Sequence, residues 1–328
     1  MDNKKIIFSG VQPSGNIHLG NYLGAIRNWV ELQDKYKCLF CVVDYHAITV
    51  KQEPKELKKK IIEIAKIYLA SGIDSEKSSI FQQSQISEHT ELTWILNCTS
   101  ARMSDLNKMT QFKDKAGESQ NVSIGLFDYP ILMASDILLY QTDLVPVGED
   151  QKQHIELSRT VAKRFNNEYG NVFKIPEAVI KKEGARIMGL DDVSKKMSKS
   201  ASSEFNYIAL LDEPEKAKKK IMKAVTDSEG VVKYDLENKP EVSNLLTIFS
   251  LLSDYSLKDL EGKYKDSGYG DFKKDLAELV EKFLIDFQNK YNNIKDEEVE
   301  NILEKGAKEL KPVANKTLNS IKEKLGLS

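Results

Sequence analysis

A chain of 328 residues with 41% apolar and 30% charged residues is long enough for about two globular domains. Its formal net charge of −2 argues against a histone-like or coating role on nucleic acid, although not against a local RNA contact. It has no signal-peptide pattern, no apolar span of membrane length and an odd number of cysteines, three, so we expect a cytoplasmic protein without a disulfide framework.

The first thirty residues predict a strand, a loop and the start of a helix. An apolar run, 5–8, indicates a buried strand, residues 10–15 supply glycine and proline turn chemistry, and a helical period begins at Leu19. Gly20 and Gly24 are four residues apart, so one side of that helix lacks side chains and a ligand could approach its backbone. Free backbone N–H groups at a helix start favour a phosphate. The glycine spacing matches neither a dinucleotide fingerprint nor a P-loop, so an ordinary strand-to-helix turn is an equal alternative.

Strand and helix patterns continue to alternate through the first half of the chain. Strand patterns at 38–43 and 79–82 are each followed by a helical pattern. This alternation predicts a doubly wound α/β domain with a parallel sheet. Ligands bind beyond the carboxyl ends of such strands, where residues 8–10 and 44–46 would lie. His46 at that position is either a site residue or a capped surface histidine.

A polar stretch follows between residues 99 and 122. Its lysines most simply form a solvated helix face. The alternative is that one of them, Lys113 or Lys115, reaches a phosphate, and the pattern does not decide between these two.

Asp136 lies inside an apolar helical pattern, with Met133, Ile137 and Tyr140 on nearby turns. Burying an unpaired carboxylate costs several kcal/mol, so Asp136 must meet a hydrogen-bond donor. Spacing alone favours a donor from elsewhere in the protein. The alternative is a ligand donor, such as an indole N–H or a phenol O–H in an apolar pocket.

A short strand, 144–147, leads to an acidic helix start at 148–151. Acidic residues there are ordinary partners of the helix dipole, although Glu149 and Gln151 could also hold an amine or a ribose. A further strand is expected at 185–188.

The loop 195–201 follows that strand and contains Lys196-Met-Ser-Lys-Ser200. Two lysines three residues apart, with serines between them, could hold a triphosphate. From Asn206 onward the pattern is helical and rich in lysine, with few strand signals.

Two of these stretches together resemble the paired signatures of class I aminoacyl-tRNA synthetases, namely His18-Leu-Gly-Asn21 and Lys196-Met-Ser-Lys-Ser200. Within that class the chain is similar to the bacterial tryptophan branch over nearly its whole length. The stretches that carry this similarity are 10–15, 44–50, 109–113, 128–165 and 224–230. Asn21 stands where the general signature has a second histidine, as is usual in the tryptophan branch.

The resemblance implies a two-step reaction without a protein nucleophile. Tryptophan would attack the α-phosphorus of Mg²⁺-ATP to give tryptophanyl-adenylate and pyrophosphate, and the acyl group would pass to the 3′ end of tRNA(Trp). Catalysis would then consist of positioning and charge stabilisation. Magnesium would arrive with ATP, so we expect no resident metal site and no tightly bound cofactor. Enzymes of this branch are typically homodimers.

The resemblance also implies residue roles. The ATP site would contain Gln12, Pro13, Ser14, His18, Gly20, Asn21, Gly148, Glu149, Asp150, Ile187, Lys196, Met197, Ser198, Lys199 and Ser200. The residues assisting phosphoryl chemistry would be Gln12, Lys115, Lys196 and Lys199. The tryptophan site would contain Phe8, His46, Tyr129, Met133, Asp136, Val145 and Gln151, with Asp136 accepting the indole N–H.

The implied architecture is a Rossmann-like, doubly wound nucleotide-binding domain over residues 1–203 and a smaller all-helical domain over 204–328. The helical domain would bind the tRNA anticodon, and its last helix could pack back on the first domain. Alternatives are the tyrosyl enzyme of the same class, a small-molecule adenylyltransferase, and a non-enzymatic RNA-binding relative. Intact signatures, the helical second domain and the stretch 148–157 favour the tryptophan enzyme.

Overall fold

The computed structural model describes residues 4–109, 122–148, 151–179 and 186–327. The chain forms two compact units. Unit 1 comprises Met1–Ser14, Trp29–Lys181 and Lys295–Ser328, and unit 2 comprises Gly15–Asn28 and Lys182–Ile294. These units divide the chain differently from the expected boundary after residue 203. The division of roles between residues 1–203 and 204–328 stays a prediction.

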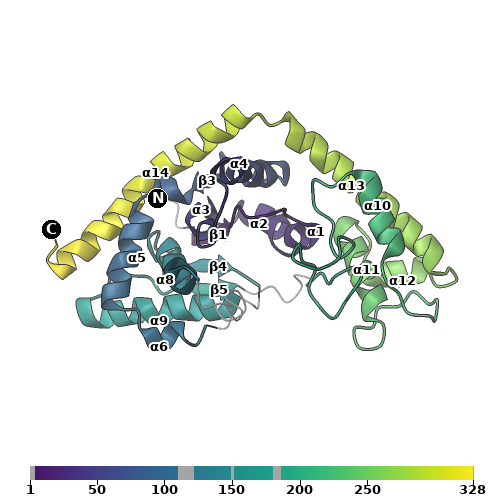
Figure 1. Ribbon diagram of the computed structural model, residues 1–328, viewed down its shortest axis with the longest axis horizontal. Coiled ribbons are helices and arrows are strands. Elements are labelled where there is room, and N and C mark those ends of the chain that lie inside the picture. Colours follow the sequence, from purple (N-terminus) through teal and green to yellow (C-terminus); the bar gives the residue numbers. More distant parts are fainter. Residues whose placement is uncertain (1–3, 110–121, 149–150, 180–185, 328) are drawn as a thin grey trace. The chain divides into compact units, whose positions relative to one another are not determined.

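Unit 1 contains a five-stranded parallel sheet in the order β3-β2-β1-β4-β5 (Figure 1). Central strands covered on both faces are mostly apolar, and β1 and β2 have continuous buried runs at 7–9 and 38–42. The strand order reverses between β1 and β4, and ligands bind at such a switch point in doubly wound sheets. The strands are β1 Ile6–Val11, β2 Lys37–Val42, β3 Ser78–Gln82, β4 Leu144–Pro146 and β5 Glu177–Val179.

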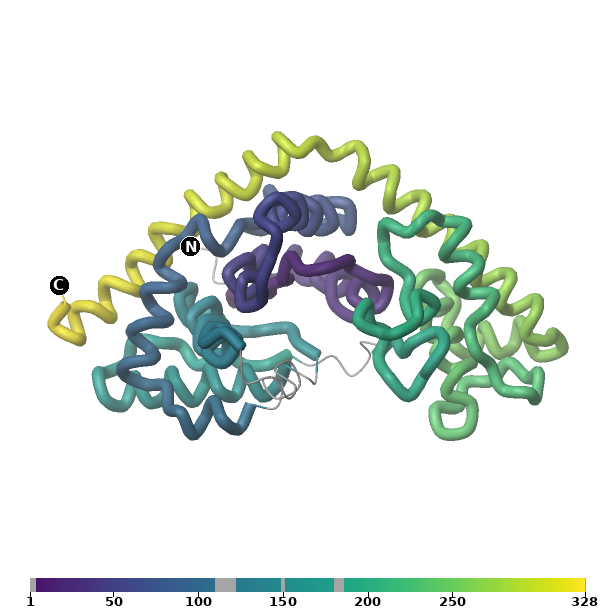
Figure 2. Tube along the Cα trace, viewed as in Figure 1, coloured from purple at the N-terminus to yellow at the C-terminus, as the bar shows by residue number. Residues whose placement is uncertain are grey.

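Helices cover the sheet of unit 1. α8 packs against both α5 and α9, and α4 packs against β2. The C-terminal helix α14 runs along the edge strand β3 and beside α4 and α5, so Figure 2 shows the end of the chain next to segments from its first hundred residues. These helices are α3 Asp44–Ala47, α4 Pro54–Ala70, α5 Glu88–Thr99, α6 Met103–Leu106, α8 Ile124–Leu138, α9 Lys152–Tyr169 and α14 Asp296–Leu325, with the 3-10 turn η2 Gln83–Gln85 after β3.

Unit 2 is built from helices. Its main packing joins α10 to α13, with α11 against both α12 and α13. The helix expected from Leu19 is a composite, because a π-helical segment interrupts its α-helical pattern. The elements are α1 Leu19–Asn21, the π-helix η1 Tyr22–Ile26, α2 Arg27–Leu32, α10 Pro214–Lys223, α11 Pro240–Leu252, α12 Leu257–Lys263 and α13 Tyr269–Asn293, and α2 continues into unit 1.

The predicted fold class, a doubly wound parallel sheet with a helical C-terminal region, is confirmed. The predicted strand at 185–188 is wrong for its described part, 186–188, because Met188 forms a single antiparallel bridge with Lys196 instead of joining the sheet. Residue 185 lies outside the described residues. Among the described helices, none combines the length and the apolar character that a bilayer crossing requires.

Candidate active site

Asp136 is buried in α8 and surrounded by polar side chains from other elements of unit 1. Its side chain is 1% exposed. His46 Nε2, from α3, lies 2.8 Å from its Oδ2, and Gln83 Nε2 donates to its Oδ1 at 2.6 Å. Burial alone would raise the pKa of Asp136, but the contacts with His46 and His89 hold it well below its usual range. Asp136 is therefore an ionised carboxylate.

His89, in the first turn of α5, connects Asp136 to Tyr140. Its Nδ1 lies 2.7 Å from Asp136 Oδ1, close enough for an ion pair but off the line that a hydrogen bond prefers. Its Nε2 lies 2.8 Å from the Tyr140 hydroxyl, and its ring stacks on Phe81. The ring thus places one nitrogen against the carboxylate and the other against the Tyr140 hydroxyl.

Aromatic and aliphatic side chains line the same region. Phe8 on β1 stacks on Tyr140 at a centroid distance of 6.2 Å, and Tyr129 meets His46 edge-on at 6.2 Å. Burial raises the pKa of Tyr129 to about 12, so its hydroxyl, 2.9 Å from His154 Nε2, stays protonated. Val145 on β4 is buried in the same hydrophobic cluster, and Met133 on α8 packs against it.

The end of β1 connects to this region through Gln12. Its Nε2 donates to the backbone oxygen of His46 at 2.7 Å. Pro13 is buried and Ser14 half-buried in the following loop. Gly148, exposed after β4, accepts a backbone hydrogen bond from Gln151, the residue that precedes α9. The expected roles of Glu149, Asp150, Lys113 and Lys115 concern residues outside the described ranges.

In unit 2, His18 caps the start of α1. Its Nδ1 accepts from the Asn21 backbone N–H at 3.3 Å, and Asn21 Oδ1 accepts from the His18 backbone N–H at 3.2 Å. Burial, together with the charges of Lys196 and Lys199, lowers the pKa of His18 to about 4. His18 is therefore neutral at physiological pH, and because Nδ1 is an acceptor, its proton is on Nε2, which is a donor.

The loop Lys196–Ser200 belongs to a short hairpin of unit 2. The Met197 N–H donates to Ile187 O at 3.0 Å, and the Gly189 N–H donates to Lys195 O at 2.9 Å. Met197 and Ile187 are buried, each 1% exposed, whereas Lys196 and Lys199 are exposed. Buried Met197 thus anchors the hairpin and leaves both ammonium groups accessible.

Two glycines lie where the first loop closely approaches this hairpin. A Cβ at Gly20 would lie 3.1 Å from His18 Nδ1 and 3.4 Å from Met197 Sδ. Gly15 has a φ of +66°, which favours glycine, and a Cβ there would overlap the Lys199 side chain. The two loops that sequence patterns singled out separately are therefore in contact within one compact unit.

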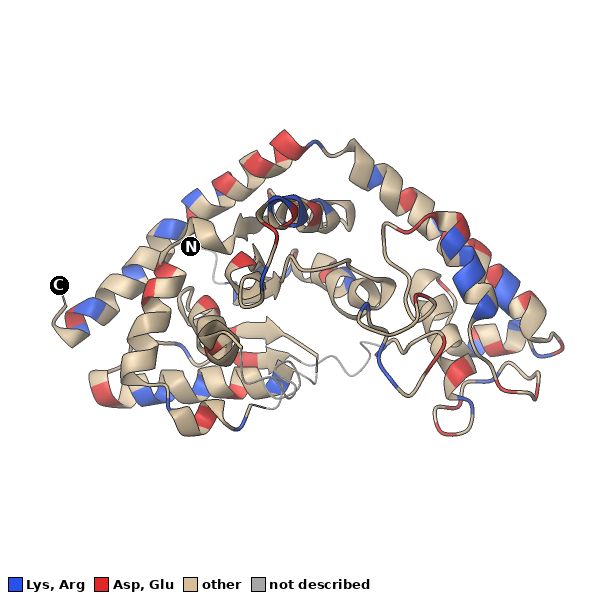
Figure 3. Cartoon of the chain, in the orientation of Figure 1, with Lys and Arg blue, Asp and Glu red and all other residues tan. Residues whose placement is uncertain are grey.

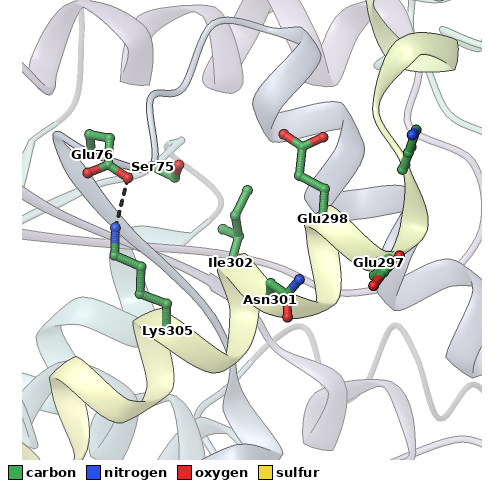
Figure 4. A pocket seen from close by; sticks show the side chains of 8 residues that line it. Ser75, Glu76, Glu297, Glu298, Asn301, Ile302 and Lys305 are labelled. Atoms are coloured by element: carbon green, nitrogen blue, oxygen red, sulfur yellow. Dashed lines mark hydrogen bonds and ion pairs between the residues drawn. The ribbon is translucent and has the colours of Figure 1, made fainter.

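One surface hollow of unit 1 contains none of the predicted site residues. It lies where α14 begins, next to the turn that holds Ser75 and Glu76 (Figure 4). Lys305 and Glu76 form an exposed ion pair of 2.7 Å across it. Within the described ranges, no group of three or more histidine, cysteine and acidic side chains is arranged to hold a metal ion.

Comparison with known proteins assigns the chain to a family. The model of the family "tRNA synthetases class I (W and Y)" matches residues 1–285. The chain belongs to this family. It is 54% identical over 323 residues to a tryptophan–tRNA ligase of Caldanaerobacter subterraneus, covering 98% of both chains. It is 53% identical over 326 residues to that of Helicobacter pylori, covering 99% of both.

Solved structures of class I synthetases share the fold. The tryptophanyl-tRNA synthetase of Mycoplasma pneumoniae superposes with a TM-score of 0.93 at 37% identity, with 99% of this chain and 98% of that chain covered. The Campylobacter jejuni enzyme, solved with ADP and tryptophan, gives a TM-score of 0.84 at 39% identity over 98% of this chain and 100% of that chain.

Sequence analysis of this synthetase missed two side chains that contact Asp136, Gln83 and His89. It also missed that the Tyr140 hydroxyl contacts His89. Gln83 directly follows β3, so the rule of strand carboxyl ends that pointed to His46 could have found it. His89 lies early in a helix without any pattern that marks it.

Proposed function

We propose that the chain is a tryptophan–tRNA ligase. Full-length identity above half to tryptophan–tRNA ligases carries the proposal, and the relative crystallised with ADP and tryptophan supports both small substrates. In the reaction, a carboxylate oxygen of tryptophan attacks the α-phosphorus of Mg²⁺-ATP, and the bond to pyrophosphate breaks. The aminoacyl group of the adenylate then passes to the 3′-terminal ribose of tRNA(Trp), and AMP leaves.

In this proposal Asp136 accepts the indole N–H of tryptophan. An ionised carboxylate offers about four acceptor positions. The hydrogen bonds with His46 and Gln83 use two of them and His89 lies against Oδ1, which leaves an acceptor position on Oδ2 for a ligand. The indole would lie against the apolar side chains of the cluster, with Gln151 near the amino-acid end. The residues assigned to the tryptophan site are Phe8, His46, Tyr129, Met133, Asp136, Val145 and Gln151.

The ATP phosphates are assigned to neutral and cationic donors. The neutral His18 ring offers its Nε2–H, and the exposed ammonium groups of Lys196 and Lys199 stabilise the charge that develops on pyrophosphate. Magnesium would come with the nucleotide as part of the substrate. We assign the other ATP contacts to Gln12, Pro13, Ser14, Gly20, Asn21, Gly148, Glu149, Asp150, Ile187, Met197, Ser198 and Ser200, and a further phosphate contact to Lys115.

The helical part of the chain is proposed to bind tRNA. Figure 3 shows lysines gathered on α10, where Lys216, Lys219 and Lys223 are exposed. A local basic face can bind phosphates although the net charge of the whole chain is −2. We propose that this activity is cytoplasmic, as charging of tRNA for translation requires.

We also propose a homodimer. Unit 1 exposes large apolar side chains around α5 and the start of α8, including Trp94 at 71% and Ile124 at 85%. The hydrogen bond from Ser123 Oγ to Thr49 O brings exposed Ile48 and Val50 beside Ile124. Large apolar side chains exposed to this extent favour an interaction surface on unit 1.

The test is the charging of purified tRNA(Trp) and tRNA(Tyr), each with labelled tryptophan and labelled tyrosine. We expect charging only for tryptophan with tRNA(Trp). Charging of tRNA(Tyr) with tyrosine would instead identify the tyrosyl enzyme. Failure of every pair, with protein that binds ATP, would favour a non-enzymatic relative.

A further inference from the structure

The hairpin that carries Lys196 and Lys199 is held at its base by a buried amide side chain. Asn206 is 3% exposed and lies beyond the loop, in the same compact unit. Its Oδ1 accepts from the Ser198 backbone N–H at 3.0 Å, and its Nδ2 donates to Asp191 Oδ1 at 2.6 Å. One side chain therefore ties the middle of the lysine loop to the segment that precedes it.

The backbone of Asn206 adds to this connection. Its carbonyl oxygen accepts from the Leu190 N–H at 3.0 Å, and its N–H donates to Ser203 O at 3.2 Å. A Cβ at Gly189 would overlap the Asn206 side-chain amide, so glycine makes room for it. A second asparagine, Asn244 of α11, holds the neighbouring segment by both backbone groups of Met188, at 2.9 and 3.0 Å.

Ser198 lies between the two lysines, so the direction of its N–H fixes the path of the backbone that carries both. Met197, before the second lysine, is anchored by burial. After that lysine the chain is exposed at Ser200 and only half-buried at Ala201. The hydrogen bond from the Ser198 N–H to Asn206 therefore restrains the backbone that carries Lys199. Catalysis by charge stabilisation requires such donors to be fixed before the reaction.

We propose that Asn206 is a positioning residue for Lys196 and Lys199 in amino-acid activation. It touches neither substrate; it acts through the Ser198 backbone. The proposal rests on the function proposed above as far as activation is concerned, whereas the restraint on the loop stands on geometry alone.

The experiment compares four variants of the full chain: Asn206→Ala, Asn206→Asp, Asp191→Asn and the double variant Asp191→Asn/Asn206→Asp. The single Asn206→Asp change sets two carboxylates against each other. The double variant restores a donor and an acceptor at the same two positions with unchanged net charge. Asn166→Ala is the matched control, because Asn166 holds the Val172 and Phe173 N–H groups in unit 1 in the same way.

The first readout is hydrogen–deuterium exchange of the segment around Ser198 without substrates. We expect faster exchange in both single Asn206 variants, recovery in the double variant and no change in the control. The second readout is tryptophan-dependent ATP–pyrophosphate exchange. We expect kcat to fall about tenfold in Asn206→Ala, the scale for losing the hydrogen bond that restrains Ser198. Tryptophan affinity should be unchanged, and the double variant should recover most of kcat.

Unchanged exchange at Ser198 in Asn206→Ala would overturn the restraint itself. A loosened loop with wild-type kcat, or a double variant as slow as Asn206→Asp, would overturn the positioning role. If the wild-type protein shows no tryptophan-dependent activity, the proposed function fails, and the hydrogen-exchange readout still decides whether Asn206 restrains the loop.

Discussion

At the scale of single residues, two buried ionisable groups are held in opposite charge states by their surroundings. Asp136 is kept ionised by His46 and His89, whereas His18 is kept neutral by burial and by two lysines. A fixed anion suits an indole N–H, and a neutral imidazole beside ammonium groups can donate to phosphate without adding a third charge. Both charge states follow from packing.

Replacing Asp136 tests whether its carboxylate binds tryptophan. We expect Asp136→Ala to weaken tryptophan binding by roughly 10- to 100-fold, the range for a hydrogen bond to a charged group, and to leave ATP binding intact. Calorimetric titration with each ligand measures both. Asp128→Ala, in the same helix with Asn97 as its partner, is the control and should bind tryptophan normally. Wild-type tryptophan affinity in folded Asp136→Ala protein would rule this role out.

The neutral state of His18 predicts a pH dependence of stability. The unfolded chain takes up a proton at His18 near pH 6.5, whereas the folded protein takes it up only near pH 4. As pH falls from 6.5 to 4 the unfolded state binds the extra proton, so His18 lowers the free energy of unfolding in that window and has no further effect below it. Urea unfolding of wild type and His18→Asn should therefore differ by an amount that changes with pH between 4 and 6.5. A constant difference would contradict the lowered pKa.

Lys199 should act in the transition state. We expect Lys199→Ala to lower kcat for ATP–pyrophosphate exchange by roughly a hundredfold, the scale for losing one preorganised electrostatic contact, with KM for ATP little changed. Lys195→Ala removes an exposed lysine outside the signature and should have a much smaller effect. A defect confined to KM would show that Lys199 contributes only ground-state binding.

At the scale of elements, the packing of α14 on β3 depends on one glycine. A Cβ at Gly306 would overlap the backbone carbonyl of Ile80, which cannot move without disturbing the strand. We expect Gly306→Ala to destabilise unit 1 by about 2 kcal/mol or more, the cost of overpacking.

Gly262, in α12, is the matched control for Gly306. A Cβ there meets nothing within 4 Å, so Gly262→Ala should leave stability unchanged or raise it by up to about 1 kcal/mol. Thermal and urea unfolding measure both variants. Equal stability of the two would mean that α14 does not pack closely on β3.

The elements that sequence analysis predicted correctly are those with a strong local period. Short apolar runs mark the strands β1, β2 and β3. Apolar residues at helical spacing mark the long helices α13 and α14. Short β5 and the hairpin around Met188 were not predicted, because their form depends on partners distant in sequence. For the same reason the buried position of Asp136 could be predicted from its neighbours, but its partners Gln83 and His89 could not.

At the scale of the whole molecule, the exposed apolar side chains of unit 1 predict self-association. We expect light scattering to give twice the chain mass for the wild-type protein, and the monomer mass for Trp94→Glu. Tyr255→Glu, which changes another exposed aromatic residue in unit 2, should remain dimeric. A monomeric wild type at micromolar concentration would exclude the proposed dimer.

The central claim is that the chain activates tryptophan. The most direct test is ATP–pyrophosphate exchange with each of the twenty amino acids supplied singly. Exchange with tryptophan alone is the predicted result, because it requires both the adenylation chemistry and the indole site at Asp136. Exchange with tyrosine would retain the reaction but contradict the assignment of the site, and no exchange with any amino acid would contradict the account as a whole.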